Sequence, residues 1–196
     1  MKRIYLLSMM FIFLIMLSSC KYEENTEITV IDEIVIGEQT WTAYNYDHTL
    51  FQSNKSYGVA YHNDDGNLTI YGALLTYQEA LDACPDGWHL PTLTEWQTLF
   101  TYLGGTKVAG GKLKSTNYWQ APNIGELNTS GFRALPGGGA SNNLQFDGLG
   151  WSAHFWSSTK SGDMVYVPTL FNDSAEVELI VIPQNMYASV RYIKDK

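Results

Sequence analysis

Two segments in the middle of the chain have the hydrophobic period of an amphipathic helix. Each begins with a threonine three residues before a glutamate, the spacing of a capping box that satisfies two free backbone amides. These boxes are Thr76 with Glu79 and Thr92 with Glu95. The apolar residues that share a helical face are Tyr77, Ala80, Leu81 and Cys84 in the first segment, and Leu93, Trp96, Phe100 and Leu103 in the second. We therefore expect two helices, the second ending at Gly104-Gly105.

Two hairpins are expected before these helices. Residues 28–36 are rich in β-branched side chains and lead through a turn at Gly37 into residues 40–42, which is a hairpin pattern. Asp65-Gly66 is typical of a two-residue hairpin turn and stands before the apolar residues 68–71. The N-terminal half is therefore predicted to mix short strands with the two helices.

The C-terminal half has a different pattern. After Gly105 the regular alternation fades into glycines and single aromatic residues, which predicts a long irregular loop region. Regular pattern returns near residue 155, and strands are expected over residues 164–170, 177–182 and 188–193. Together with the helices, this order predicts an α+β fold.

The first twenty residues have the pattern of a bacterial lipoprotein signal. Lys2 and Arg3 precede an apolar run over residues 4–17, which is shorter than the roughly 20 residues of a spanning helix. The run ends in Ser18-Ser19-Cys20, which resembles the lipobox in which the cysteine is acylated. We expect a signal peptide over residues 1–19 and a lipid anchor on Cys20. The alternative is an ordinary signal peptide in which this cysteine is incidental.

A short tether is expected over residues 20–27, before a single domain over residues 28–196. Glu23-Glu24 in the tether resembles the surface-export signal of some Bacteroidetes lipoproteins, although a plain solvated linker would look the same. We therefore expect an outer-membrane lipoprotein exposed at the cell surface. Its contact with the membrane would be made through the lipid on Cys20.

Charge narrows the range of partners. The chain has 12 basic and 20 acidic residues, a net charge of −8, and loss of residues 1–19 would remove two basic residues and no acidic ones. Phosphate backbones would be repelled by such a surface, so no nucleic-acid partner is expected. A hydrophobic content of 45% argues for a globular rather than a disordered chain.

Several short motifs, in a fixed order, resemble one known family. They are Val35-Ile36-Gly37-Glu38-Gln39-Thr40-Trp41, Ala83-Cys84-Pro85-Asp86-Gly87-Trp88-His89-Leu90-Pro91-Thr92 with Glu95-Trp96, Tyr102-Leu103-Gly104-Gly105, Ala109-Gly110-Gly111-Lys112-Leu113-Lys114, Ser130-Gly131-Phe132, Trp156-Ser157-Ser158-Thr159 and Ser189-Val190-Arg191. The chain thus resembles the Fibrobacter succinogenes major paralogous domain over residues 30–195.

The resemblance implies a C-type-lectin-like fold, related also to formylglycine-generating enzymes. Such a fold has two helices, small twisted antiparallel sheets and a long irregular loop region. It also implies a disulfide between Cys84 and a cysteine after Val190-Arg191, but this chain has Tyr192 there. We therefore expect Cys84 to be unpaired. A buried thiol and an exposed reactive thiol both remain open.

No constellation of residues indicates catalysis. His48, His62, His89 and His154 are scattered without metal-ligand spacing, and the expected domain has one cysteine. Neither a nucleophile elbow nor a phosphate-binding loop is present in the sequence. We therefore expect no enzymatic activity, no metal site and no cofactor.

The loop region carries the candidate ligand-binding residues. They are Tyr118, Trp119, Asn142, Asn143, Asp147, Trp151 and His154. Flat aromatic rings could stack on sugar faces while amides and a carboxylate hydrogen-bond to hydroxyls. The alternative is that the aromatics belong to the core, because tryptophan is highly buried on average. We expect a non-enzymatic glycan-binding module, with a structural or adhesin-like surface protein that binds a protein partner as the second hypothesis.

Overall fold

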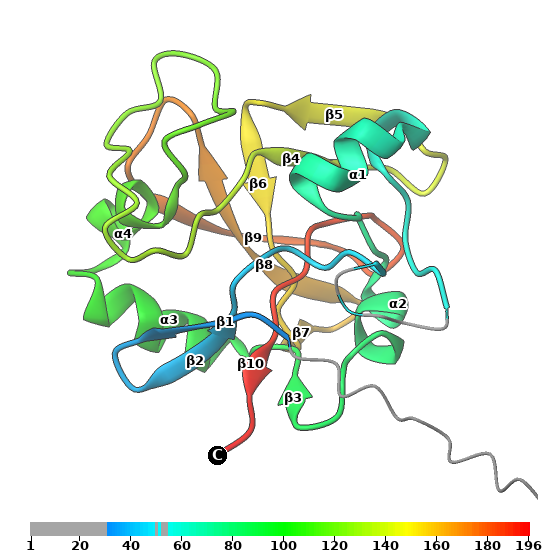
Figure 1. Ribbon diagram of the computed structural model, residues 1–196, viewed down its shortest axis with the longest axis horizontal. Coiled ribbons are helices and arrows are strands. Elements are labelled where there is room, and N and C mark those ends of the chain that lie inside the picture. Colours follow the sequence, from blue (N-terminus) through cyan, green and yellow to red (C-terminus); the bar gives the residue numbers. More distant parts are fainter. Residues whose placement is uncertain (1–30, 50, 52–54) are drawn as a thin grey trace, which may run out of the picture.

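The computed structural model describes residues 31–49, 51 and 55–196. The expected signal peptide, Cys20 and the tether lie outside the described residues. Helices and strands alternate along the chain in an α+β arrangement, which confirms the predicted fold class (Figure 1). The helices are η1 (Tyr61–Asn63, a 3₁₀ turn), α1 (Asp65–Tyr71), α2 (Tyr77–Asp82), α3 (Leu93–Tyr102) and α4 (Thr106–Leu113).

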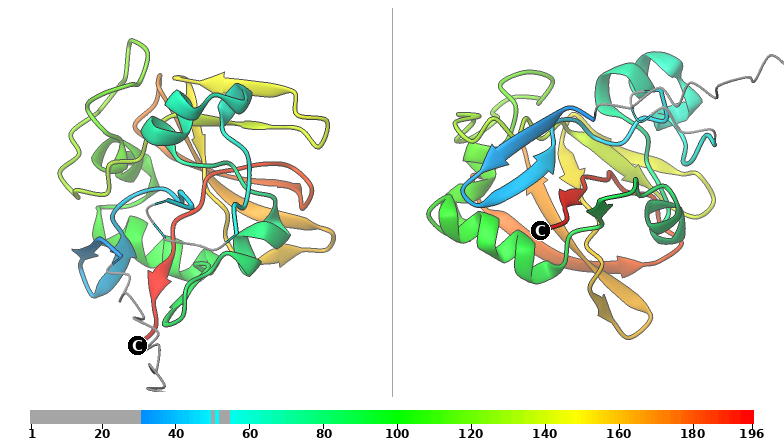
Figure 2. Two further views of the ribbon diagram at one scale, coloured as in Figure 1. Left: turned by 45° about the vertical axis from the view of Figure 1, so that its right-hand side comes forward. Right: turned by 60° about the horizontal axis from the view of Figure 1, so that its bottom comes forward.

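A small antiparallel sheet joins the two ends of the domain. Its strand order is β1 (Glu33–Ile36), β2 (Gln39–Thr42), β10 (Ile193–Lys194) and β3 (Trp88–His89). The β1–β2 pair is the predicted N-terminal hairpin, with Ile36 opposite Gln39 around the turn. The C-terminal strand β10 lies between β2 and β3 and pairs with both, so the end of the chain is needed to hold this sheet together (Figures 1 and 2).

A larger sheet forms the centre of the molecule. Its path is β5 (Phe146–Leu149), β4 (Gly137–Ala140), β6 (Ser152–His154), β8 (Met164–Phe171) and β7 (Lys160–Ser161), and β9 (Val177–Pro183) pairs with β8. The β8–β9 hairpin confirms the strands expected over residues 164–170 and 177–182. One face of this hairpin packs under α3 and α4, which lie on one side of the molecule, while α1 and α2 lie on the other (Figures 1 and 2).

Both predicted capping boxes are present. The side chains of Thr76 and Thr92 accept hydrogen bonds from the backbone amides of Glu79 and Glu95, respectively. In each box the glutamate side chain in turn accepts a hydrogen bond from the backbone amide of the threonine. In α3 the buried face carries Trp96, Leu99 and Phe100. In α2, by contrast, Leu81 is 39% exposed, so its expected place on the buried face is wrong.

Two other predictions about local structure are wrong. Asp65-Gly66 does not turn a hairpin but begins α1, because the side chain of Asp64 accepts the Gly66 amide at 2.8 Å and caps a helix. The last predicted strand, over residues 188–193, is reduced to β10 and a few isolated bridges that include Ala188 and Ser189. Helix α4 was not expected.

The core consists of two clusters of buried side chains. One lies beneath α3 and α4, where Trp41 contacts Trp96 with ring centroids 4.7 Å apart and Phe132 packs edge-on against both. The other surrounds Trp156 and Tyr192 and includes Val165 and Val167 of β8. Burial on this scale, rather than helix or strand propensity, holds the short elements in place.

Candidate functional site

A cleft of about 1030 Å³ opens along the larger sheet. Strands β4, β5 and β6, which are neighbours in the sheet, form one wall, and the end of β8, part of β9 and the segment after β9 contribute the rest. Three of the seven predicted ligand-binding residues line it: Asp147, Trp151 and His154. Its size lies in the range of sites for small molecules, which makes it the first candidate for a binding site.

Trp151 stands at the rim of the cleft with 51% of its surface exposed. It follows two glycines with left-handed backbone angles, Gly148 at φ 83° near the end of β5 and Gly150 at φ 81° just after it, which turn the chain sharply into β6. The amide of Trp151 donates to the Gly148 carbonyl at 2.8 Å, and its own carbonyl accepts from Asn172 at 2.9 Å. The backbone of this tryptophan is therefore held on both sides, while half of the residue's surface is exposed.

His154 forms part of the inner wall, and both of its ring nitrogens are occupied. Nδ1 lies 3.0 Å from Thr169 Oγ1, and Nε2 lies 3.0 Å from Ser152 Oγ. Because the Thr169 hydroxyl donates to the Val167 carbonyl, Nδ1–H donates to Thr169 and the Ser152 hydroxyl donates to Nε2. Burial lowers the pKa of His154 to about 4, against the opposing charge of Asp147. The imidazole is therefore neutral at pH 7.

Trp119 is not part of this cleft, so its assignment to a ligand-binding surface is wrong. Only 9% of the residue is exposed, and it packs in the core cluster under α3 and α4. Its indole N–H donates to the Ala134 carbonyl at 3.0 Å, and the Lys114 ammonium lies 5.2 Å above its ring. The indole N–H of Trp119 is therefore hydrogen-bonded within the protein, and neither face of its buried ring is open to a ligand.

The other three predicted residues are exposed but do not line the cleft. Tyr118 is 54% exposed, has a φ of 72° and contacts Tyr71 edge-on at 5.8 Å. Asn142 and Asn143 lie in the exposed turn between β4 and β5. The structure therefore brings together three of the predicted residues and separates them from these three.

Several residues of the cleft were not expected. Asn172 and Asp173 stand at the end of β8, and the aromatic rings of Phe146 and Tyr187 complete the wall. The side-chain amide of Asn172 is buried and donates to the carbonyls of residues 120 and 121, both at 3.2 Å, so it ties that loop to the cleft. A polar pair that begins two residues after the end of a predicted strand was the available signal for Asn172-Asp173.

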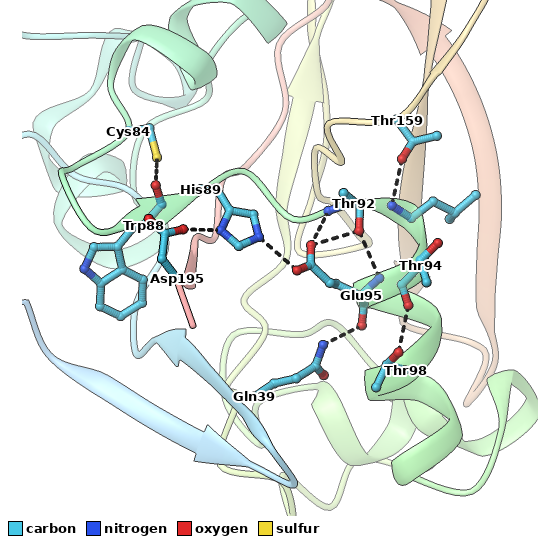
Figure 3. Close-up of polar contacts among 11 residues, drawn as sticks. Gln39, Cys84, Trp88, His89, Thr92, Thr94, Glu95, Thr98, Thr159 and Asp195 are labelled. Atoms are coloured by element: carbon cyan, nitrogen blue, oxygen red, sulfur yellow. Dashed lines mark hydrogen bonds and ion pairs between the residues drawn. The ribbon is translucent and has the colours of Figure 1, made fainter.

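A second polar cluster lies where the small sheet meets α3. His89 in β3 reaches Asp195 with Nδ1 at 2.6 Å and Glu95 with Nε2 at 2.9 Å (Figure 3). Glu95 also accepts the backbone amide and the hydroxyl of Thr92, both at 2.8 Å, so one carboxylate caps α3 and holds the histidine. This cluster ties β3, α3 and the C-terminus together.

The ionisation of this cluster follows from its geometry. Burial alone would lower the pKa of His89, but the hydrogen bonds and charges of Glu95 and Asp195 outweigh it and raise the pKa above 6.5. Burial would raise the pKa of Glu95, but hydrogen bonds from Thr92 and His89 lower it below 4.5. A positive imidazole between two carboxylates is therefore favoured in the folded state.

A pH-dependent contribution to stability follows. Because the folded-state pKa of His89 is raised, its contribution is complete below the unfolded-state pKa of about 6.5 and is lost as the pH rises through the higher folded-state pKa. We expect His89→Gln to lower the free energy of unfolding more at about pH 6 than at about pH 9, as measured by urea denaturation. Asp195→Asn should show the same trend. A loss that is equal at both pH values would contradict this account.

Cys84 is a free thiol, as predicted, and it is partly buried. Its Sγ donates to the Trp88 carbonyl at 3.1 Å (Figure 3). Burial, with the charges of Asp195 and Asp86, raises the pKa of the thiol to about 12, so little reactive thiolate is present at neutral pH. Tyr192 is fully buried in the cluster against which Cys84 packs, and its hydroxyl donates to the Ala80 carbonyl at 2.8 Å.

The family model of the Fibrobacter succinogenes major domain matches residues 34–194 of the sequence. The chain belongs to this family. No curated protein and no solved structure matches the chain. The C-type-lectin-like character of this Fibrobacter succinogenes major domain therefore stays a prediction, whereas its α+β class is established. Over the described part of the chain, no helix is long and apolar enough to cross a membrane, and no group of His, Cys, Asp and Glu is arranged to hold a metal ion.

Proposed function

We propose that this domain is a non-enzymatic binding module whose cleft takes a glycan. The observation that carries the proposal is the open cleft with Trp151 half-exposed at its rim and hydrogen-bonding groups along its walls. A broad aromatic ring supplies an apolar surface on which a sugar ring can stack, and Asp147 and Gln145 offer partners to hydroxyls. The lectin-like fold implied by the family resemblance agrees with this reading.

The state of His154 favours binding over catalysis. A general base works best with a pKa near the operating pH, and a pKa of about 4 makes this imidazole a weak base at pH 7. Its partner Ser152 is 4% exposed, and the Ser152 hydroxyl donates its proton in a hydrogen bond to Nε2 of His154. The Ser152–His154–Thr169 chain of hydrogen bonds therefore acts as a rigid wall rather than as a nucleophile and its base.

The place of action is proposed from the sequence. Lipid on Cys20 would hold the domain at the outer membrane, and the acidic start of the tether favours the cell surface. Detergent partition of a Cys20→Ala variant tests the anchor, because a variant that still partitions with lipid would rule out this attachment.

Replacement of Trp151 tests the glycan site. We expect Trp151→Ala to weaken glycan binding at least about tenfold, since a tryptophan at the centre of a contact is typically worth about 2 kcal/mol. Glycan-array screening followed by calorimetry on the best ligand measures the effect. The melting temperature should change little, because half of the surface of Trp151 is already exposed.

Tyr102→Ala provides the matched control. Tyr102 is an aromatic residue in α3 with 66% exposure, and it does not line the cleft. Its loss should leave glycan binding unchanged. If the intact domain binds no glycan but captures a protein from cell-envelope extracts in a Trp151-independent manner, the adhesin-like alternative replaces the proposal.

A further inference from the structure

The charges that line the cleft are of one sign. Asp147 and Asp173 each contribute a carboxylate, and no Lys or Arg among the residues that the structure describes lines the cleft. The histidine in the wall, His154, is neutral at pH 7 because burial lowers its pKa to about 4. A ligand that enters the cleft therefore meets two carboxylates and no cationic side chain from the described residues.

Both carboxylates are available to a ligand. Asp147 accepts the amide of Gly148 at 2.8 Å through one oxygen, which leaves the other free, and Asp173 is exposed. Neither forms an ion pair with a residue that the structure describes. Lys114 is fully buried, and its ammonium donates to the carbonyls of residues 124, 171 and 174 at 2.8–3.0 Å, the last two of which stand on either side of Asp173 in the chain. Its charge acts on Asp173 from within the protein, but Lys114 does not line the cleft and so presents no cation to a ligand there.

Aromatic rings accompany these carboxylates. Trp151 at the rim and Phe146, Phe171 and Tyr187 in the walls present apolar and π-electron surface to the cleft. The face of an aromatic ring attracts a cation, most strongly for tryptophan, and a carboxylate forms short, strong hydrogen bonds with an ammonium group. Aromatic rings and carboxylates together suit an organic cation.

We propose that the glycan taken by this cleft carries free amines, as in an oligomer of an amino sugar. A sugar ring lies on Trp151, and its ammonium group faces Asp147 or Asp173. Uronic acids and sulfated sugars are disfavoured because their charges would approach two carboxylates with no cation to receive them. This inference rests on the proposed glycan-binding function and specifies the class of glycan.

Three oligomers of equal length test the inference with the full chain in detergent. They are β-1,4-linked glucosamine, which is cationic at about pH 6, its neutral N-acetylated counterpart, and an acidic oligogalacturonate. We expect calorimetry to show binding at least about tenfold tighter for the glucosamine oligomer than for the N-acetylated one. The preference should shrink as salt is raised, because part of the attraction is screened.

Paired variants separate the cleft from the general acidity of the protein. Asp147→Asn with Asp173→Asn should abolish the preference for the amine, so that the glucosamine oligomer binds no tighter than its N-acetylated counterpart. Asp86→Asn with Asp163→Asn removes the same charge from exposed positions outside the cleft and should leave the preference intact. Equal losses in both pairs would show that the attraction is to the whole acidic surface, which overturns the inference.

The remaining outcomes distinguish this inference from the function on which it rests. Equal binding of the amine and N-acetylated oligomers, still sensitive to Trp151→Ala, overturns the amine preference and supports a glycan cleft. Tightest binding of the acidic oligomer overturns it as well. Binding of none of the three, together with no hit on a glycan array, overturns both the amine preference and the glycan-binding function.

Discussion

Replacing Arg191 with methionine is expected to lower the free energy of unfolding by about 3–5 kcal/mol, a large part of the stability of an ordinary domain. The guanidinium is fully buried. Nε donates to Asn45 Oδ1 at 2.8 Å, Nη1 to the Thr42 carbonyl at 2.7 Å, and Nη2 to the Phe132 carbonyl at 3.0 Å. Methionine fills a similar space, but it leaves these buried acceptors without a donor.

The arrangement is unusual because none of the partners of Arg191 is a carboxylate. Burial, with the positive charge of Arg133 nearby, lowers the pKa of Arg191 to about 9, so the group is still charged at pH 7. The Phe132 ring, whose centroid lies 4.5 Å from the guanidinium carbon, provides further stabilisation. One side chain thus fastens the end of β2 and the loop around residue 132 to the last segment of the chain.

Urea denaturation measures the loss, and Arg133→Met is the matched control. Arg133 is exposed, and its guanidinium contacts the ring of Tyr44 at 5.6 Å. The control should therefore stay within about 0.5 kcal/mol of the unchanged protein. Arg191→Lys should fall between the two, because a lysine keeps the charge but loses the planar fork of donors. A loss below about 1 kcal/mol for Arg191→Met would show that the network is dispensable.

The parts of the fold that could be predicted from the sequence depend on local chemistry. The starts of α2 and α3 follow from Thr76 and Thr92, because a capping box joins groups only three residues apart. The β8–β9 hairpin likewise follows from a run of β-branched residues on each side of a turn. Helix α1 was missed because the Asp-Gly pair at residues 65–66 suits a hairpin turn as well as the first turn of a helix capped by Asp64.

The site depends on contacts that no local pattern contains. Trp119 and Trp151 both stand in a glycine-rich, irregular region, yet one is buried and the other half-exposed. What separates them is the Ala134 carbonyl, 15 residues from Trp119, and the turn at Gly148 and Gly150 beside Trp151. Residues such as Asn172 matter because they reach a loop some 50 residues away. Sequence reasoning could therefore find the residue types of the cleft but not which of them meet.

Helix α4 was missed for a related reason. Its centre is Gly110-Gly111, and a glycine pair normally indicates a break in a helix. Both glycines are buried against neighbouring backbone: a Cβ at residue 110 would lie 2.7 Å from the Glu176 carbonyl oxygen, and one at residue 111 would overlap the Gly125 carbonyl. Gly111 also donates its amide to the Ala175 carbonyl at 3.1 Å and accepts the Leu127 amide at 3.0 Å. The glycines are thus required by close packing, not by helix termination.

Gly111→Ala is therefore expected to lower the free energy of unfolding by about 2–3 kcal/mol, although alanine favours a helix over glycine by about 1 kcal/mol. The overlap is with backbone atoms, which cannot move aside as a side chain can. Gly66→Ala is the control: Gly66 is an exposed residue of α1, and the nearest atom to its added Cβ would be Asp64 Oδ1 at 3.1 Å, on an exposed side chain that can shift slightly and still cap the helix. This variant should be neutral or more stable by up to about 1 kcal/mol. Urea denaturation should thus show a loss of stability for Gly111→Ala and no loss for Gly66→Ala, although the substitution is the same. Stabilisation by Gly111→Ala would show that α4 does not pack against residue 125 as described.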